Sequence, residues 1–462
     1  MPIIDFSLLK QLKMKKEFVK LTNQKNRVFP HLLLVSIVLI LLSSCAQKKQ
    51  PPAFGNKELA KVIFTMTDIM LQDITNPPLA ARFFSYTCLA GYEVVAQYDT
   101  SFKTMYGKLN GYPAIKMPSV VHPYSNQLSA LLAMMETAKK IQPSGSLMGL
   151  FEKKFIDSCS KLGYDDEIIA NSLTYAQEVS KQILAYAKAD GYNKISNLPR
   201  YTAHPEDGYW YPTPPAFMAA VEPYFKTVRP FTLDSCDQFK PTPPTAFSAA
   251  KGSAFYHLTE AVYKEGIDLS EDHRLIAAFW DCNPFAVQNG GHLQYGLKKI
   301  SPGAHWLGIT GIACAKANKG FEESLQIYTS VSIGLMDAFI TCWDEKYRSN
   351  RVRPETAIRK YIDPQWEPLL QTPPFPEYLS GHSVISSASA VILTHYFGDN
   401  FSYTDDVEVV YGLPSRNFTS FNQAAEEAGV SRFYGGIHFM DAITNGQLQG
   451  GKVGNWMIQK IK

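Results

Sequence analysis

Hydrophobic side chains recur at helical spacing along most of the chain from residue 56 onward. In the first such stripe, from Leu59 to Met70, apolar residues return every three or four positions, as on the buried face of an α-helix. The same spacing is found in six later segments, at residues 80–97, 125–141, 165–188, 243–264, 320–345 and 382–397. Alternating, strand-like patterns are scarce. Because amphipathic helices of this length bury their apolar stripes best against one another, we predict an all-α fold.

A stretch rich in proline, glycine and tyrosine interrupts the helical pattern near the middle of the chain. It runs from Tyr201 to Pro215 and ends in the prolines of residues 241–244. Such a composition disfavours helix and is typical of an ordered connection between two helical units. We therefore predict two packed helical bundles joined by a long crossover, with the N-terminal bundle and the crossover at 57–240 and the C-terminal bundle at 241–462.

The first 45 residues have the pattern of an export signal. Seven basic residues between positions 10 and 27 precede an apolar run from Leu32 to Leu42, which is shorter than the roughly 20 residues that span a bilayer. The ending Leu42-Ser43-Ser44-Cys45 resembles a bacterial lipoprotein box. We predict a signal peptide at 1–45, lipidation of Cys45 and a flexible tether at 46–56, so that the protein is exported and anchored to the membrane, facing the periplasm or the cell surface. A plain cleaved signal or a signal anchor is the alternative.

Composition and charge exclude several classes of protein. The 462 residues include 45 Lys+Arg and 42 Asp+Glu, a net charge of +3, and the one dense basic run lies at the extreme N-terminus, so we expect no nucleic-acid partner. With 45% hydrophobic and 19% charged residues, the chain can bury a large core and is not a disordered protein. The seven cysteines form no Cys-x-x-Cys pair and have no regular spacing with histidine. The spacing therefore predicts no zinc site, and it favours buried free thiols over disulfides.

Three segments in the C-terminal half contain the residues of a candidate anion site, at 343–354, 374–383 and 431–438. Three cations among them can neutralise a multiply charged tetrahedral oxyanion, with the arginine forks supplying paired hydrogen bonds. Alone, each segment is more typical of a solvated basic surface or an ordinary helix cap than of a site, but their combination favours a single pocket. The candidate residues are Lys346, Arg353, Ser380, Gly381, His382, Arg432 and His438.

The local sequence predicts how these side chains are presented. Ser380 directly precedes the apolar run at 384–392, so we expect it to cap the N-terminus of a helix, where free backbone amides and a hydroxyl attract anions. Gly381 lets the backbone approach an oxyanion closely. Arg353 precedes Pro354, which disfavours helix at the arginine and favours a new helix beginning at the proline.

The order Lys-x6-Arg-Pro, then Ser-Gly-His, then Ser-Arg-x5-His resembles the signature of the vanadium-dependent haloperoxidase and type 2 phosphatidic acid phosphatase superfamily. The joint match spans Lys346 to His438, and pieces at 208–215, 229–231 and 302–306 look like segments of the soluble bacterial haloperoxidase branch. The family usually has proline before Ser-Gly-His, whereas this chain has Leu379. That difference relaxes a turn without removing a ligand.

The resemblance implies a vanadate cofactor and a role for each matching position. His438 would be the axial ligand of the vanadium, and His382 would be the acid–base group beside the apical oxygen. Trp343 and Phe375 match side chains that flank the halide and peroxide side of the pocket in chloride-oxidising members; the alternative is that both are simply core aromatics. The groups expected to bind the equatorial oxygens are Lys346, Arg353, Arg432, the Ser380 hydroxyl and the Gly381 amide.

From this resemblance we expect an exported vanadium haloperoxidase-like oxidoreductase whose C-terminal bundle is catalytic. It would oxidise halide with hydrogen peroxide, in the presence of a small organic substrate. The alternative from the same pocket is an acid phosphatase that holds phosphate instead and hydrolyses phosphomonoesters through a phosphohistidine at His438. A further alternative is a lipoprotein that binds a ligand without catalysis.

Overall fold

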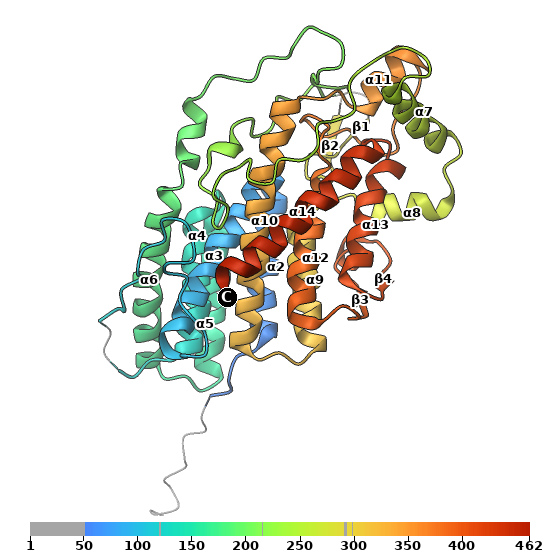
Figure 1. The fold of residues 1–462 in the computed structure, drawn as a ribbon. Helices are drawn as coiled ribbons and strands as arrows, with labels where there is room; N and C mark the ends of the chain where they lie inside the picture. The colour runs from blue at the N-terminus through green and yellow to red at the C-terminus, as the bar shows by residue number, and fades with distance from the viewer. Residues whose placement is uncertain (1–50, 120–121, 215, 291–292, 298) are drawn as a thin grey trace, which may run out of the picture. The chain divides into compact units, whose positions relative to one another are not determined.

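Helices dominate the computed structural model, as the hydrophobic spacing predicts (Figure 1). The structure describes residues 51–462 except for 120–121, 215, 291–292 and 298. The predicted signal peptide, Cys45 and residues 46–50 of the predicted tether lie outside the described residues. Ala53–Lys462 form a single compact unit, and the division into two bundles near residue 240 stays a prediction.

The N-terminal helices pack on one another and on the central helix of the molecule. Among them, α3 is buried around most of its circumference because it contacts α4, α6 and α10 together. Its start is fixed by Asn76, whose side chain accepts a hydrogen bond from the Leu79 amide at 2.9 Å, and by Pro77 in the first turn. These helices are α2 (Asn56–Gln72), α3 (Pro77–Tyr98), α4 (Asn126–Ile141), α5 (Gly145–Lys161) and α6 (Asp166–Lys188).

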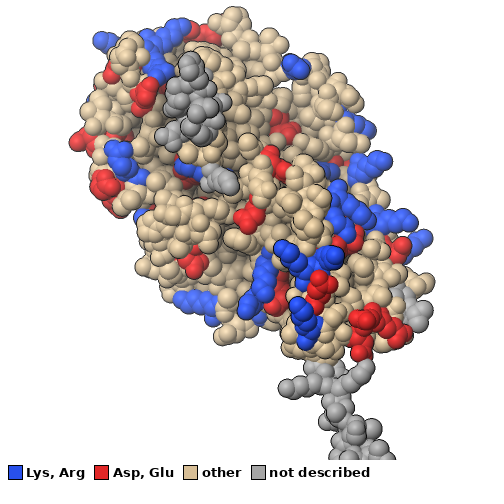
Figure 2. All heavy atoms as spheres, turned by 180° about the vertical axis from the view of Figure 1, so that it is seen from behind, with Lys and Arg blue, Asp and Glu red and all other residues tan. Residues whose placement is uncertain are grey.

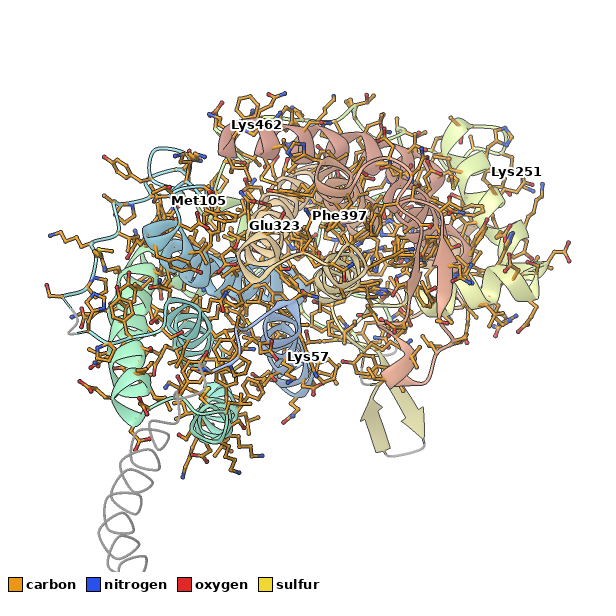
Figure 3. All side chains as sticks on the ribbon, turned by 90° about the horizontal axis from the view of Figure 1, so that it is seen from below. Lys57, Met105, Lys251, Glu323, Phe397 and Lys462 are labelled. Atoms are coloured by element: carbon orange, nitrogen blue, oxygen red, sulfur yellow. The ribbon has the colours of Figure 1, made fainter. Side chains whose placement is uncertain are left out.

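The central helix is α10 (Phe321–Ser349), which contacts α3 on one side and α12 and α14 on the other. Figure 3 shows its first turn, near the labelled Glu323, between the N-terminal helices and the C-terminal ones. Among the described helices, only α10 is long and apolar enough to cross a membrane, but 94% of its apolar window is buried inside the fold. The remaining α-helices are α7 (Ala254–Ile267), α8 (Glu271–Phe279), α9 (Pro302–Lys316), α11 (Pro354–Tyr361), α12 (Gly381–Phe397), α13 (Phe421–Tyr434) and α14 (Met440–Ile461).

Strands are short, in keeping with the scarcity of alternating patterns. Strand β1 (Val287–Gly290) pairs antiparallel with β2 (Leu293–Gly296), so that Val287 faces Gly296. Strand β3 (Tyr403–Asp405) pairs antiparallel with β4 (Arg416–Phe418), so that Tyr403 faces Phe418. Both pairs are local hairpins on a helical body.

The predicted crossover is irregular. Between the 3₁₀ helix η1 (Tyr192–Asn197) and α7, the described chain contains only the short 3₁₀ helix η2 (Phe225–Thr227). The helix predicted at 243–264 begins only at Ala254, because the prolines up to Pro244 donate no backbone hydrogen bonds and Gly252 adopts a positive φ of 89°.

The crossover is fixed to the central helix and to the loop that follows it. Asp337 of α10 accepts hydrogen bonds from the backbone amides of Phe231 and Thr232 at 2.7 and 2.8 Å. Farther along, the Trp210 amide donates to the Asn350 carbonyl, and the Val352 amide donates to the Gly208 carbonyl, each at 2.9 Å. These bonds fix the backbone directly before Arg353.

Helices α12 and α14 pack backbone to backbone. A Cβ atom on Gly450 of α14 would lie 2.1 Å from the carbonyl oxygen of Val384 in α12, and one on Gly454 would lie 2.8 Å from that of Ala388. The sequence pattern did not predict α14, because its glycines lower helix propensity. The same glycines allow the close approach that stabilises the helix in the fold.

Charged side chains of both signs are mixed on the face of the molecule that Figure 2 shows, and most of that face is uncharged. This distribution agrees with the nearly balanced composition. The six cysteines of the described residues are unpaired, and all except Cys236 are buried.

Candidate functional site

The three predicted segments meet at one place, although they come from different helices. Lys346 lies in the last turn of α10, and Arg353 is the N-cap residue of α11. Ser380 is the N-cap residue of α12. Arg432 lies in the last turn of α13, and His438 follows Gly436, whose φ of 75° bends the chain toward α14. The expected starts of α11 at Pro354 and of α12 after Ser380 are confirmed.

These residues surround a small cavity. Lys346 and Arg353 lie behind the aromatic ring of Phe375, with the Lys346 Nζ atom 5.0 Å and the Arg353 guanidinium carbon 5.1 Å from the ring centre. Both cations are fully buried. The predicted residues that line the cavity itself are Trp343, Phe375, Gly381, His382, Arg432 and His438.

His438 is held by hydrogen bonds on both ring nitrogens. Its Nδ1 atom lies 2.8 Å from Glu377 Oε1, and its Nε2 atom lies 3.1 Å from Nη1 of Arg353. Since a carboxylate accepts and a guanidinium donates, this network assigns the ring proton to Nδ1 and a lone pair to Nε2. Burial, followed by the charges of Arg353 and Lys346, holds the pKa of His438 well below its ordinary value. The imidazole is therefore neutral at neutral pH, as a metal ligand must be.

Glu377 is the residue of this site that the sequence reasoning missed. In addition to His438, it accepts a hydrogen bond from the Phe439 amide at 3.0 Å and one from Arg351 Nε at 2.6 Å. Arg351 in turn forms a two-pronged pair with Asp441 at 2.7 and 2.8 Å. The carboxylate contacts His438 at a sequence separation of 61 positions, and a lone Glu after Pro376 carries no signal of that contact.

The two arginines have buried N–H groups left over. Arg353 donates from Nε to the Phe375 carbonyl at 3.0 Å and from Nη1 to the Ile437 carbonyl at 2.9 Å, whereas its Nη2 has no partner among the described residues. Arg432 Nη1 lies 3.4 Å from His382 Nε2, and the buried Arg432 Nε likewise has no partner there. Buried unsatisfied donors are costly, so these two atoms mark positions for an acceptor.

Lys346 supplies charge from behind the cavity. Its ammonium donates to the carbonyls of Pro376, Glu377 and Leu379, at 3.0 Å for the first and 3.1 Å for the second. Burial, with a smaller effect of Arg353, lowers the pKa of this lysine to about 7. A direct contact from Lys346 to an anion, which the sequence predicts, would replace one of these carbonyl bonds and stays a prediction.

The start of α12 offers further donors. Ser380 Oγ accepts hydrogen bonds from the Ser383 amide at 3.3 Å and the Ser383 hydroxyl at 2.8 Å, and it donates none to the described residues. The Gly381 amide belongs to the first helical turn, where backbone N–H groups have no acceptor within the helix. A Cβ atom on Gly381 would lie 3.7 Å from the Trp343 ring and 4.0 Å from Lys346 Cε. Because glycine lacks a Cβ atom, the space between the Gly381 backbone, the Trp343 ring and Lys346 stays open.

His382 faces the same cavity and is half-buried. Burial, then the charges of Arg432 and His438, hold its pKa well below the ordinary value. It is therefore neutral at neutral pH and can accept a proton from a group bound in the cavity.

One wall of the cavity is aromatic. The rings of Trp343 and Phe375 have centroids 5.0 Å apart, and both side chains are buried. Trp343 Nε1 donates to the Val221 carbonyl of the crossover at 3.2 Å, which fixes the orientation of the indole. The two aromatics thus line the cavity and also belong to the buried core, and their role beside a halide stays a prediction.

The residues present fit a bound tetrahedral oxyanion such as vanadate. The unpartnered donors of Arg353 and Arg432, the free Ser380 hydroxyl proton and the Gly381 amide would hold its oxygens. His438 would hold vanadate through Nε2, whose lone pair would then give up its hydrogen bond from Arg353 Nη1. When bound, vanadate supplies a Lewis acid that activates hydrogen peroxide without a change in its own oxidation state.

Comparisons with known proteins agree with this site. The family model of the VCPO second helical-bundle domain matches residues 326–462. The crystal structure described as that of the first bacterial vanadium-dependent iodoperoxidase is 43% identical, has a TM-score of 0.84, and is matched over 89% of this chain and 98% of its own. No curated protein matches.

A second group of solved structures shares the fold at lower identity. The holo form of a bacterial vanadium-dependent chloroperoxidase is 14% identical, with a TM-score of 0.62 over 84% of this chain and 93% of its own. The apo form has 14% identity and a TM-score of 0.60 over 84% and 95%. At this identity the likeness concerns the fold alone.

The fold and the anion pocket define a helical enzyme of the vanadium haloperoxidase and type 2 phosphatidic acid phosphatase superfamily. Within it, the chain belongs to the vanadium-dependent haloperoxidases, and it is an oxidoreductase with vanadate as its cofactor.

Proposed function

We propose that this haloperoxidase oxidises iodide with hydrogen peroxide, while vanadate is held on His438. One observation carries the proposal: the chain covers 98% of a bacterial vanadium-dependent iodoperoxidase at 43% identity. The overall reaction consumes iodide, hydrogen peroxide and a proton, and it yields hypoiodous acid and water. Hypoiodous acid then transfers iodine to a small organic acceptor.

In this proposal the cations hold and polarise the oxyanion. Arg353 and Arg432 each have a buried N–H group without a hydrogen-bond partner among the described residues, and Arg forks match the geometry of an oxyanion. Lys346 adds positive charge, with its Nζ atom 5.0 Å from the centre of the Phe375 ring. In a buried site such charges act more strongly than in water.

His382 is the proposed acid–base group. It is half-buried, lines the cavity and has a neutral imidazole beside Arg432. A neutral ring in this position takes the proton released when hydrogen peroxide binds and returns it to the oxygen that leaves as water. Arg432, 3.4 Å away, keeps the ring from staying protonated.

Trp343 and Phe375 are the proposed halide wall. Their rings keep water from one side of the cavity, and aromatic edges carry partial positive charge. Iodide is large, polarisable and weakly hydrated, so it loses less hydration free energy than chloride when it moves from water to a site beside these rings.

The test is a halogenation assay on purified protein loaded with vanadate, with hydrogen peroxide and a phenol dye. Iodide should support turnover more than bromide or chloride, and His438→Ala should abolish it. His257→Ala is the matched control, because this histidine is 62% exposed on α7. Absence of turnover with every halide, together with vanadate-sensitive hydrolysis of para-nitrophenyl phosphate and a trapped phosphohistidine, would establish the phosphatase alternative instead.

The proposal includes export and a lipid anchor at Cys45. It is supported by the basic run between positions 10 and 27, the apolar run at 32–42 and the Leu-Ser-Ser-Cys ending. Cells fed a radiolabelled fatty acid should label the wild-type protein and not Cys45→Ala, and labelled protein should fractionate with membranes. Unlabelled wild-type protein in the cytoplasm contradicts this part of the proposal.

A further inference from the structure

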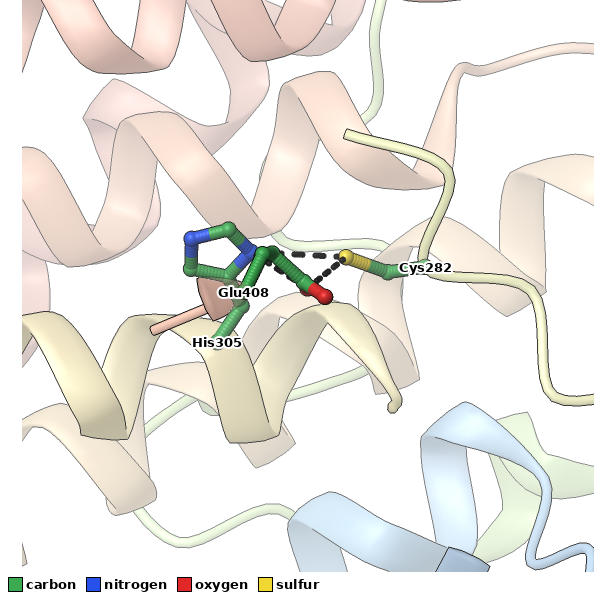
Figure 4. A group of neighbouring side chains, drawn as sticks. All are labelled: Cys282, His305 and Glu408. Carbon is green, nitrogen blue, oxygen red and sulfur yellow. Dashed lines mark hydrogen bonds and ion pairs between the residues drawn. The ribbon is translucent and has the colours of Figure 1, made fainter. Parts of the chain in front are cut away.

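A second cluster of potential metal ligands lies beside the vanadate pocket (Figure 4). It consists of Cys282 in the loop after α8, His305 in the first turn of α9 and Glu408 directly before the 3₁₀ helix η3 (Val409–Tyr411). All three side chains are buried, His305 completely. Figure 4 shows the thiol, one imidazole nitrogen and the carboxylate turned toward a common point.

The spacing of the three donor atoms matches the edges of a tetrahedral zinc site. Nδ1 of His305 lies 3.5 Å from Cys282 Sγ and 3.2 Å from Glu408 Oε1, and Sγ lies 3.7 Å from Oε1. Zinc at about 2.3 Å from sulfur and about 2.0 Å from nitrogen and oxygen gives edges of about 3.3 to 3.6 Å in a tetrahedron. Each observed distance is within about 0.2 Å of that range.

The other nitrogen of the histidine has the partner that metal-bound histidines require. His305 Nε2 lies 2.9 Å from Asp405 Oδ2, and both groups are fully buried. A carboxylate on the far nitrogen fixes the tautomer and ring orientation of a histidine that binds metal through the near one. The indole of Trp280 also stacks on the imidazole, with centroids 4.7 Å apart, so the ring cannot turn away.

We propose that Cys282, His305 and Glu408 form a buried zinc site beside the vanadate pocket, with Asp405 as the outer partner of the histidine. The donor set points to this metal, since one thiolate, one imidazole and one carboxylate in a tetrahedral arrangement suit Zn²⁺. A water molecule would complete the tetrahedron in the remaining position.

Sequence spacing gives no sign of this site, because its ligands come from three segments separated by 23 and 103 positions. No Cys-x-x-Cys or Cys–His spacing brings such residues to notice. The loop at 282, α9 and the segment at 405–408 would be joined by the metal. Cys282 also lines the cavity that contains His382 and Arg432, so the zinc would stiffen one wall of the active site.

The alternative to metal is a purely hydrogen-bonded cluster. In it, a protonated His305 lies between the carboxylates of Asp405 and Glu408, and the Cys282 thiol donates to Glu408. Burial alone lowers the pKa of His305, but Asp405 and its other partners raise it well above the ordinary value. The two arrangements differ in one observable: only the metal site has a thiolate bonded to a cation.

The deciding experiment is a titration of the vanadate-free, chelator-washed full chain with Co²⁺, a spectroscopic substitute for zinc. We expect one equivalent to bind with the thiolate-to-cobalt charge-transfer band and with the intense visible bands of a tetrahedral site. Zinc should displace the cobalt, and elemental analysis of protein purified without chelator should find one zinc per chain. Wild-type protein without the charge-transfer band would overturn the proposal, whatever the variants do.

Variants assign the ligands. Cys282→Ser should remove the charge-transfer band and weaken Co²⁺ binding at least tenfold, and Glu408→Gln should weaken binding while keeping the band. Cys314→Ser is the matched control. Cys314 is a buried free cysteine of α9, the helix that also contains His305, and it lies outside the cluster. His438→Ala should retain the metal, which separates this site from the vanadate pocket. A band that persists in Cys282→Ser, or disappears in His438→Ala, would place the metal elsewhere and refute the assignment.

Discussion

Glu377 Oε1 lies 2.8 Å from Nδ1 of His438, and Arg353 occupies the other ring nitrogen. The carboxylate therefore determines which nitrogen of His438 carries the proton and leaves the lone pair of Nε2 toward Arg353 and the anion pocket. It is itself held by Arg351 and the Phe439 amide. His438, the residue that would hold vanadate, is thus oriented by a carboxylate that does not line the cavity.

Replacing Glu377 with Gln should weaken vanadate binding more than it weakens the binding of a simple anion. Loss of a partner on the far nitrogen of a metal-bound histidine typically costs about 10- to 100-fold in affinity or activity. Sulfate takes no bond from His438, so its affinity should change little. Equilibrium binding of both anions checks the prediction. Asp441→Asn, which removes the other partner of Arg351, is the control, and equal losses for vanadate and sulfate would show that the effect is merely structural.

Arg353→Lys should lower vanadate affinity although the charge is kept. The guanidinium binds two carbonyls and still has a buried unpartnered Nη2, and a single ammonium cannot do all of this at once. Loss of one charge-assisted hydrogen bond of about 1.5 to 3 kcal/mol corresponds to roughly 10- to 150-fold in the dissociation constant. Arg348→Lys, at a half-buried ion pair of α10, should leave the constant unchanged. An unaltered affinity in Arg353→Lys would exclude a direct role for the fork.

Anion affinity should fall as the pH rises above about 7. Burial lowers the pKa of Lys346 to about 7, so the lysine is mostly neutral at higher pH. An anion then binds a charged lysine only if Lys346 takes up a proton on binding. The affinity then decreases by up to about tenfold per pH unit. Sulfate, whose own charge is constant, can be titrated by calorimetry from about pH 6 to about pH 9. Lys346→Arg stays charged and should show a flat profile; a profile with the wild-type slope in this variant would assign the titration to another group.

Gly450→Ala should destabilise the fold, whereas the neighbouring Gly451→Ala should not. The methyl group that the first substitution adds would meet the Val384 carbonyl at 2.1 Å, and overpacking of this kind costs about 1 to 3 kcal/mol or more. A methyl at position 451 meets nothing within 4 Å and should add about 0.5 to 1 kcal/mol of helix stability. Denaturant unfolding of both variants provides the comparison, and equal stabilities would contradict the backbone contact of α12 and α14.

Local sequence predicts local features of this protein well. The cap at Ser380, the start of α11 at Pro354 and most long helices follow from short patterns of residues that interact within one or two turns. Helix α14 was missed because glycines that weaken an isolated helix stabilise this one through packing on α12. The delayed start of α7 likewise depends on prolines whose effect outweighs the apolar spacing before Ala254.

The residues of the candidate site likewise differ in how readily the sequence reveals them. The residues that we expect to bind an anion directly belong to short motifs, so Arg353, Arg432 and His438 could be selected as candidates from the sequence. Residues that orient them, above all Glu377, act across long separations and have no motif of their own. The cluster of Cys282 and His305 is hidden for the same reason.

The backbone hydrogen bonds between the crossover and the loop before Arg353 affect when the active site can form. Backbone bonds join Gly208 and Trp210 to positions more than a hundred residues later, and contacts of such long range form slowly because the intervening chain must first be ordered. A nascent chain therefore cannot present a finished pocket while its second half is still being made. Catalytic competence becomes a property of the complete polypeptide, and oxidant production begins only after the whole molecule has folded.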